Sequence, residues 1–233
     1  MEATVNIIKQ LVADFNAKLV GIYTDPIGLG SGLQTIKVCE TSHLRPGSII
    51  TIGIIEYEVV SIVGTLITLK GGSTITTSGT FAFPEVFFFH GTPIMVGSEL
   101  NNIRDSEAKT PFIYLYEVLE DEFIEEVGSS IERNSNLRLF FLDQANFKDW
   151  DTEHHYSEAI VPMNKLSAEF IHFLKTNGNI GLFPNFSLIY HANFTIKYTT
   201  NGHETRLFND ELSGVELKIN LPIKKSFVCS DCF

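Results

Sequence analysis

The segment Leu137–Asp143 reads Leu-Arg-Leu-Phe-Phe-Leu-Asp, which places apolar residues on both alternations of an extended strand. The segment Pro111–Leu119 has the same character, with aromatic residues on one alternation and aliphatic residues between them. A strand that is covered on both faces produces this pattern. The two segments are therefore predicted to pair as antiparallel strands of one sheet.

Two amphipathic helices are predicted on either side of these strands in the sequence. Residues 3–19 and 158–176 each carry an apolar stripe at helical spacing. Two further strands are predicted at 188–199 and 214–221, each close to an Asn-Gly or Ser-Gly turn signal. Together these elements predict an α+β domain in which an antiparallel sheet carries both helices on one face.

An all-β module is predicted between the first helix and these strands. Residues 33–90 contain short alternating segments separated by glycine turns, and they are similar to the small SH3-like or OB-like barrels. Residues 20–33 contain Asp25-Pro26 and several glycines, and they are interpreted as a flexible joint. The predicted domains are a discontinuous α+β core, residues 1–32 and 91–233, and an inserted barrel, residues 33–90.

The composition describes an acidic chain with enough apolar residues to form a core. Of 233 residues, 44% are hydrophobic, and 28 Asp+Glu against 17 Lys+Arg give a net charge of -11. The hydrophobic content excludes a disordered chain, and the acidic balance argues against a general nucleic-acid binder. The longest apolar stretch, Ser48–Leu69, contains Glu56 and Glu58 and alternates as a strand does, so no membrane-spanning segment is predicted.

The cysteines and glycines indicate neither a redox site nor a nucleotide-binding loop. Cys39, Cys229 and Cys232 are too few for a disulfide framework, and reduced thiols in a cytosolic environment are expected. Gly28–Gly32 contains alternating glycines, but a strand-like segment follows it where a nucleotide loop needs a helix. No nucleophile motif or phosphate-binding lysine motif is present. The chain is therefore predicted to be non-enzymatic and to use no cofactor.

The densest group of chemically active side chains is Asp149, Asp151, His154 and His155. Carboxylates and imidazoles this close in sequence can bind a divalent metal, which would suit a metal-dependent hydrolase. The same residues also fit a polar loop that leads into a helix, because Asp and Glu stabilise helix N-termini. The group lacks the H-x-x-x-H or H-x-E spacing of a metal site, so the start of a helix is the preferred interpretation.

One aromatic segment and one acidic segment can each be interpreted in a structural or a functional way. Phe81–Phe89 is dominated by aromatic residues, which fits either a strand buried on both faces or a contact between subunits. The acidic run Glu120–Glu126 fits a solvated loop tip, since paired carboxylates act in catalysis only when they are buried and differently perturbed.

The order of the predicted elements resembles that of the tail-terminator and neck (head–tail joining) proteins of tailed bacteriophages. The matching segments are the helix Val5–Leu19, the strands Pro111–Glu117 and Leu137–Leu142, the helix Ile160–Ile171 and the closing strand Gly214–Ile223. Those proteins are small α+β subunits that assemble into rings at the end of the tail tube. The barrel module departs from that compact form and would be an insertion.

The resemblance implies a structural assembly protein of the virion, assembled in the host cytoplasm, that forms a hexamer or another homo-oligomeric ring in the neck or tail. Its partners would be copies of itself and neighbouring tail or neck proteins, and DNA would only pass through the lumen, where an acidic wall repels phosphate. Ring contacts are heterologous, and edge strands, such as 188–199 or 214–221, can form them by β-augmentation. The candidate interface residues are Phe87, Phe88, Phe89, Phe194, Ile196, Tyr198, Leu217 and Ile219.

Two alternatives come from other classes of protein. The first is a cytosolic binding module in which the 33–90 barrel recognises a peptide or another protein. The second is a hydrolase that uses a metal held by the Asp149–His155 group. Deletion of the barrel would abolish binding in the first case, and metal analysis of the purified protein would decide the second.

Overall fold

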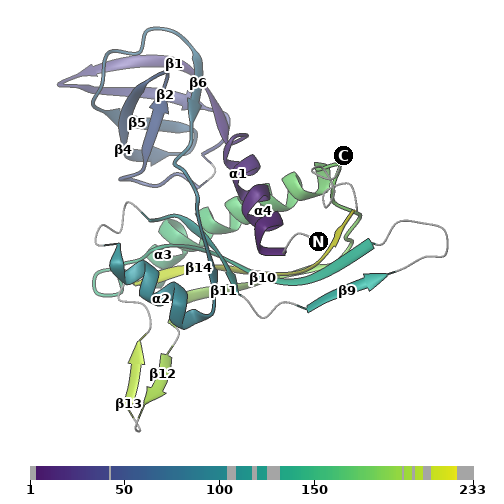
Figure 1. The fold of residues 1–233 in the computed structure, drawn as a ribbon. Coiled ribbons are helices and arrows are strands. Elements are labelled where there is room, and N and C mark those ends of the chain that lie inside the picture. The colour runs from purple at the N-terminus through teal and green to yellow at the C-terminus, as the bar shows by residue number, and fades with distance from the viewer. Residues whose placement is uncertain are drawn as a thin grey trace. The chain divides into compact units, whose positions relative to one another are not determined.

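The chain is a mixed α+β protein with a closed β-barrel and a second, larger sheet (Figure 1). The computed structural model describes residues 4–41, 43–103, 109–116, 120–124, 132–195, 197–200, 203–206 and 211–224. Two compact units make up the chain, residues 14–85 and residues 1–13 with 86–233. The predicted combination of an α+β chain with a small barrel is confirmed, and the boundaries differ from the predicted ones for reasons that lie in the strands themselves.

The barrel unit consists of six antiparallel strands in the closed order β1-β2-β5-β4-β3-β6, with β6 paired back to β1. Closure leaves no strand edge of this sheet unpaired. The inward-facing side chains form one core, and five of them are fully buried, namely Ile36, Ile50, Val59, Ile67 and Leu69. The strands are β1 (Val20–Gly30), β2 (Leu33–Val38), β3 (Ile49–Ile52), β4 (Ile55–Val63), β5 (Leu66–Lys70) and β6 (Gly79–Ala82).

The predicted joint at residues 20–33 is wrong, because it is the first strand of the barrel. The pairing of β1 with β2 shifts register between Thr24 and Ile27 and again between Gly28 and Gly30. Asp25 and Gly30 have φ angles of 49° and 82°, the left-handed conformation that bulges use. The breaker residues therefore mark irregularities inside a strand and not the end of one.

The predicted single strand Phe81–His90 is also wrong, because it divides between the two units. Gly79–Ala82 is β6 of the barrel, and Phe87–Gly91 is β7 of the larger sheet. Pro84 lies between them, and proline cannot donate a hydrogen bond to a sheet ladder. The boundary between the units therefore falls at residues 85 and 86 and not at residues 90 and 91.

The larger unit contains a sheet in the order β11-β14-β10-β8-β7, with β9 joining β10 beside β8. β10 and β14 pair over twelve residues, from Arg133–Ile223 to Gln144–Leu212, and β8 pairs antiparallel with β10 as the two apolar segments predict. Its elements are α1 (Thr4–Asn16), β7 (Phe87–Gly91), α2 (Pro93–Asn102), β8 (Phe112–Tyr116), β9 (Glu120–Ile124), β10 (Glu132–Gln144), α3 (Thr152–His155), the π-helical turn η1 (Tyr156–Ile160), α4 (Val161–Thr176), β11 (Phe186–Phe194), β12 (Lys197–Thr200), β13 (His203–Arg206) and β14 (Leu212–Ile223).

The sheet is mixed where a purely antiparallel sheet is predicted, because β7 runs parallel to β8. Parallel neighbours need a crossover connection, and α2 provides it. Pro93 begins α2, and the buried Lys109 ammonium donates to the carbonyls of Leu100 and Ile103 at the C-terminal end of this helix. The Leu100 carbonyl also accepts from the backbone N–H of Ile103, so the ammonium adds a second donor there and caps the C-terminal end of the helix.

Helices cover both faces of the larger sheet, because α2, which is not one of the two predicted helices, lies on the face opposite α4. Phe141 of β10 packs edge-on against Phe170 of α4, with ring centroids 5.7 Å apart. Phe140 shares a core with Val96 and Leu100 of α2. Since successive residues of a strand point to opposite faces, α4 and α2 lie on opposite sides of β10. The second predicted helix is confirmed as α4, with Pro162 in its first turn after η1.

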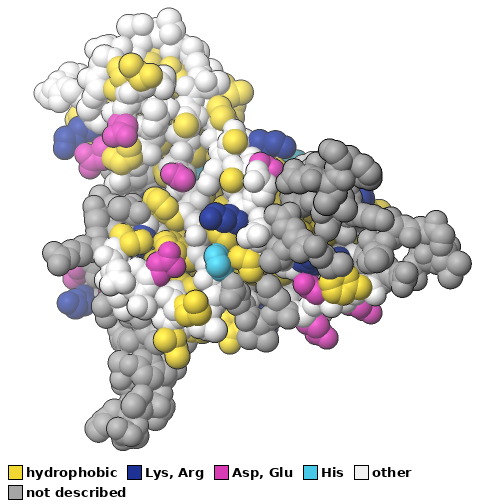
Figure 2. All heavy atoms as spheres, in the orientation of Figure 1, with side chains coloured by type: hydrophobic (Ala, Val, Ile, Leu, Met, Phe, Trp, Pro, Cys, Tyr) yellow, Lys and Arg dark blue, Asp and Glu magenta, His cyan; other side chains and the backbone are white. Residues whose placement is uncertain are grey.

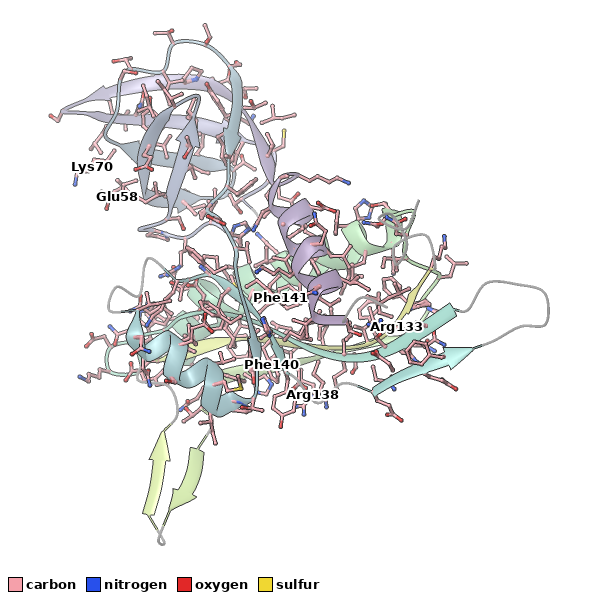
Figure 3. All side chains as sticks on the ribbon, viewed as in Figure 1. Glu58, Lys70, Arg133, Arg138, Phe140 and Phe141 are labelled. Carbon is pink, nitrogen blue, oxygen red and sulfur yellow. The ribbon has the colours of Figure 1, made fainter. Side chains whose placement is uncertain are left out.

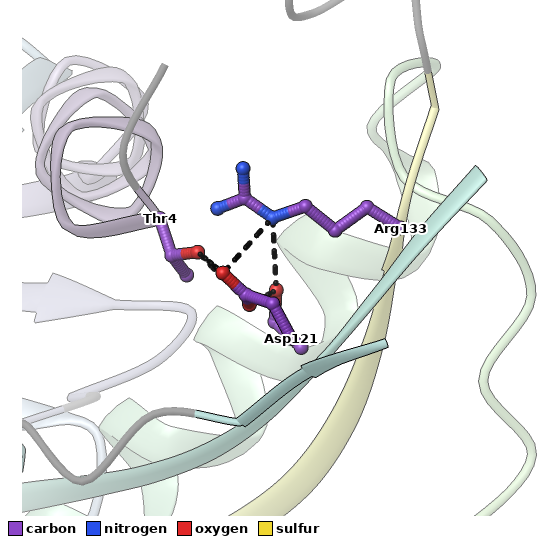
Figure 4. Close-up of polar contacts among 4 residues, drawn as sticks. Thr4, Asp121 and Arg133 are labelled. Atoms are coloured by element: carbon purple, nitrogen blue, oxygen red, sulfur yellow. Dashed lines mark hydrogen bonds and ion pairs between the residues drawn. The ribbon is translucent and has the colours of Figure 1, made fainter. Parts of the chain in front are cut away.

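The N-terminal helix is fixed to the sheet by a polar contact at its first described residue (Figure 4). Thr4 Oγ1 donates to Asp121 Oδ2 of β9 at 2.8 Å. The same carboxylate accepts a hydrogen bond of 2.6 Å from Ser135 Oγ and lies 3.4 Å from Arg133 Nε, both on β10. One half-buried carboxylate thus joins α1, β9 and β10.

Candidate interaction surface

One part of the α2 face of the larger sheet carries charged side chains. Arg138 of β10 is 44% exposed, and its guanidinium lies over the rings of Tyr116 and Phe140, 5.2 and 5.5 Å from their centroids (Figure 3). Stacking on two rings holds the guanidinium in place without using its hydrogen-bond donors. Its Nε donates to Glu216 Oε1 of β14 at 2.7 Å.

Glu216 is an almost completely buried carboxylate that organises this surface. Its side chain is 3% exposed, and Oε2 lies 3.1 Å from His191 Nε2 of β11 while Oε1 lies 3.6 Å from Lys218 Nζ. Burial raises the pKa of Glu216. Hydrogen bonds from Arg138 and His191 and the positive charges of Arg138 and Lys218 lower this pKa by more than burial raises it, so the pKa of Glu216 lies below the usual value. The ionised carboxylate therefore forms ion pairs with two half-exposed cations, Arg138 and Lys218.

A shallow hollow of about 560 Å³ lies beside these cations. It crosses the sheet from β9 to β11, and Asn136 is the direct neighbour of both Glu120 and Asn220 in the strand register. Asn136 Nδ2 donates to Glu120 Oε2 at 3.4 Å. The hollow is lined by a polar row and the edge of the charged group, including Glu120, Asn136, Arg138, Ser187, Lys218 and Asn220. Leu137, Phe186 and Ile219 also line the hollow, so it offers apolar contacts as well as hydrogen-bond donors and acceptors.

Three strands of this sheet have an unpaired edge among the strands that the structure describes, namely β11, β9 and β7, and β7 pairs only with β8. β11 pairs only with β14, and β9 pairs only with β10. The edges of β11 and β9 expose apolar side chains, with exposed fractions of 40% for Phe186, 38% for Ile189, 50% for Tyr190 and 48% for Phe123. An unpaired edge presents backbone donors and acceptors that can pair with another strand.

The predicted interface residues divide into three groups. Phe89, Phe194, Leu217 and Ile219 are buried at 6% exposure or less, so they stabilise the core and present no surface to a partner. Phe87 and Phe88 are half-buried in β7. Ile196 lies outside the described residues, and Tyr198 belongs to the β12 backbone although its side chain is not described.

One of the two predicted edge strands is correctly placed and the other is not. β11 is an edge strand and contains the first part of the predicted strand 188–199, whereas residues 197–199 belong to β12 of a separate two-stranded sheet. β14, which includes the predicted strand 214–221, pairs with β10 on one side and β11 on the other. A strand paired on both sides has no backbone groups left for β-augmentation. The alternating sequence pattern of residues 214–221 could not show whether this strand lies at an edge or inside the sheet.

The Asp149–His155 group is distributed among separate partners. Asp151 is the N-cap of α3, accepting a hydrogen bond of 2.9 Å from the backbone N–H of His154 and lying 2.8 Å from His154 Nδ1. The backbone hydrogen bond and then the ring contact lower the pKa of Asp151. His155 instead packs against the rings of Phe147 and Trp150. These contacts match the helix-start interpretation.

Other sequence features of possible chemical interest are also placed. No group of three or more His, Cys, Asp or Glu side chains that could hold a metal occurs within the described part of the chain. Cys39 is an exposed free thiol, whereas Cys229 and Cys232 lie outside that part. The predicted solvated loop at Glu120–Glu126 is wrong for residues 120–124, which form β9. Charged residues on both alternations of β9 conceal its strand pattern.

Comparison with protein-family models, with curated proteins and with solved structures finds no match to this chain. Among the described helices, none has the length and apolar character that a membrane crossing requires. The inference of function therefore starts from the charged surface and the unpaired edges of β11 and β9.

Proposed function

We propose that this chain is a non-enzymatic structural subunit of a tailed-phage virion that assembles with copies of itself into a ring in the neck or tail. The observation that carries the proposal is the pair of unpaired edges, β11 and β9, on opposite sides of one sheet. A subunit with two different edges can associate head to tail, and such heterologous contacts close into a ring when the rotation between subunits permits.

The exposed apolar side chains of β11 support an assembly role. Soluble proteins usually protect an edge strand with lysine, proline or a covering segment. β11 instead exposes Phe186, Ile189 and Tyr190 along nine residues. Such an edge is prone to uncontrolled pairing unless a specific partner strand occupies it. A ring in which every β11 is occupied by the next subunit removes this liability.

The virion setting rests on the resemblance of the element order to tail-terminator and neck proteins. In that setting DNA passes through the ring, and the net charge of -11 suits a wall that does not retain phosphate. The neighbouring tail or neck proteins would bind the two open ends of the ring. The chain would be found in the virion after assembly in the host cytoplasm.

The test is the mass of the full chain in solution together with the protein content of purified virions. The proposal expects an oligomer that is a whole-number multiple of 26.1 kDa and a stoichiometric band in the particles. Some rings assemble only on their partner, so the particle measurement decides. A chain absent from particles and strictly monomeric would overturn the proposal.

A protein-binding module is the second candidate, and the surface of the barrel favours it. Hydrophobic side chains are visible on the surface of the barrel unit (Figure 2). Val63 and Leu66 are direct neighbours in the strand register and are 72% and 49% exposed, and Ile27 and Leu29 are each 57% exposed. Under this second proposal, the six-stranded barrel is an SH3-like or OB-like module. Replacing Ile27 and Leu29 by serine should abolish capture of a partner while leaving oligomer mass unchanged.

A further inference from the structure

We propose that the unpaired edge of β11 in one subunit accepts β9 of a second copy of this chain, antiparallel, with Glu122 of the incoming strand paired to Lys218. This inference rests on the proposed function, since it names the contact through which the ring would form. It is carried by three observations on the larger unit, namely strand polarity, the face on which each side chain lies, and charge.

The polarity of the strands permits the contact. At this end of the sheet the order is β9-β10-β14-β11, and each neighbouring pair is antiparallel. β9 therefore runs antiparallel to β11 within one subunit. A second copy that continues the sheet with the same face and strand direction keeps this relationship. Its β9 consequently meets the first copy's β11 in the antiparallel arrangement, which forms the more stable ladder.

The side chains on the α2 face are complementary in charge. Glu120 is the register neighbour of Asn136, which is the neighbour of Asn220, so Glu120 and Glu122 point to the same face as Arg138 and Lys218. The incoming β9 thus brings carboxylates to the face on which the cations lie. Lys218 shares the single carboxylate of Glu216 with Arg138 and His191, and Glu122 has no partner among the described residues.

The opposite face is complementary in apolar character. Phe123 of β9 is 48% exposed and Phe186 of β11 is 40% exposed, and both belong to the α4 face. The register that sets Phe123 opposite Phe186 also sets Glu122 opposite Ser187. Aromatic cross-strand pairs of this kind stabilise a ladder. One register therefore pairs Phe123 with Phe186 on the α4 face and brings Glu122 beside Lys218 on the α2 face.

The small side chain of Ser187 leaves room for the ionic contact. Ser187 is the direct neighbour of Lys218, and Lys218 is 45% exposed. Adjacent strands are about 4.8 Å apart, so the incoming Glu122 backbone lies about 9.6 Å from that of Lys218. A glutamate and a lysine side chain together span this distance. The contact gives each subunit a positive receptor and a negative donor, which opposes the mutual repulsion of chains that each carry a charge of -11.

Charge reversal in the full chain tests the contact. Lys218→Glu and Glu122→Lys alone should each weaken self-association about tenfold, and the double variant should restore it. Matched controls are Lys148→Glu and Glu99→Lys, which reverse exposed charges of the same unit elsewhere and should leave association unchanged. Mass photometry gives the oligomer population, and Trp150 fluorescence reports whether each variant is folded.

A disulfide test locates the strands directly. In a background with the three native cysteines replaced by serine, Ser187→Cys and Glu122→Cys are made in separate chains and mixed under oxidising conditions. A covalent dimer that forms only in the mixture supports the pairing. If the chain forms oligomers but the reversals do not affect them and no mixed disulfide forms, this contact is wrong and the ring proposal stands. A chain that stays monomeric at millimolar concentration also overturns the contact, while its presence in virions still decides the proposed function.

Discussion

Arg138 and Glu216 are joined diagonally across β10 and β14, by a hydrogen bond of 2.7 Å from Nε to Oε1. The direct neighbour of Arg138 in the strand register is Lys218, two residues beyond Glu216. The diagonal contact places one buried acid between two cations and leaves Lys218 turned partly to solvent. The Arg138–Glu216 contact therefore stabilises the pairing of β10 with β14 and also positions the charged side chains near the β11 edge.

Glu216→Gln should destabilise the larger unit by about 1–3 kcal/mol, because the amide replaces charge-assisted hydrogen bonds with weaker ones in a buried position. Urea unfolding followed by Trp150 fluorescence measures this change, since Trp150 is the only tryptophan and belongs to this unit. Glu99→Gln, an exposed change on α2, is the control and should alter stability little.

The same carboxylate should make this unit less stable in acid. The pKa of Glu216 is lowered on folding, so its stabilising contribution is complete above the unfolded value of 4.5 and is lost as the pH falls through the folded value. The wild type and Glu216→Gln should therefore differ in stability at pH 7 and converge in strong acid. A constant difference across this range would contradict the assignment.

The barrel unit should lose stability at a higher pH, through His43. This imidazole is buried, and burial lowers its pKa to about 4, with a partly offsetting contact of 3.4 Å between Nε2 and the carbonyl of Pro84. The unfolded chain takes up the proton near pH 6.5 and the folded barrel does so only near pH 4. Stability is therefore complete above pH 6.5 and falls by about 3 kcal/mol between pH 6.5 and 4.

The His43 effect can be isolated because this is the only histidine in residues 14–85. Urea titrations followed by the methyl NMR signals of Ile36, Ile50 and Val59 report on the barrel core at each pH. In His43→Gln the decline between pH 6.5 and 4 should disappear. An unchanged decline in that variant would show that other groups cause it.

The close approach of β10 and β14 should make Gly214 intolerant of any side chain. A Cβ at this position would overlap the carbonyl oxygen of Phe141, a backbone atom that cannot rotate away. Gly214→Ala should therefore cost about 3 kcal/mol or more, or prevent folding of the larger unit. Gly178→Ala is the matched control, since a Cβ there meets nothing within 4 Å. Thermal unfolding of the two variants makes the comparison.

The sequence allows prediction of those elements whose pattern is set by burial. β8 and β10 are apolar on both alternations because helices cover both faces of the sheet, and α4 shows its stripe because one side meets β10 and β14. β9 could not be found in this way, because its carboxylates lie on both faces. α2 could not be predicted from the sequence because Val96 and Leu100 provide only a short apolar stripe.

The charged surface could not be predicted because its members are distant in sequence. Arg138 and Glu216 are separated by 78 residues, and they meet only because β10 and β14 pair in one register. Their sequence neighbours are apolar residues that suggest a core strand. A charge inside an apolar strand is the only local signal, and it indicates a buried partner without identifying it.

The carboxylate of Asp121 should control how firmly α1 is held. It accepts from Thr4 Oγ1 and Ser135 Oγ and lies next to the guanidinium of Arg133, so it links the first turn of the helix to two strands. Asp121→Asn should cost about 1–2 kcal/mol, because the charge that Arg133 neutralises is lost. Amide hydrogen exchange at Ile7, Ile8 and Leu11 should become faster than in the wild type.

A double-mutant cycle with Thr4→Val separates the direct contact from general damage to the sheet. If the Thr4–Asp121 hydrogen bond couples the helix to β9, the two changes together should cost about 1 kcal/mol less than the sum of the single changes. Exchange in the barrel core at Ile50 and Val59 serves as the internal control and should stay constant. Full additivity, or faster exchange throughout the chain, would show that Asp121 stabilises the sheet without anchoring α1.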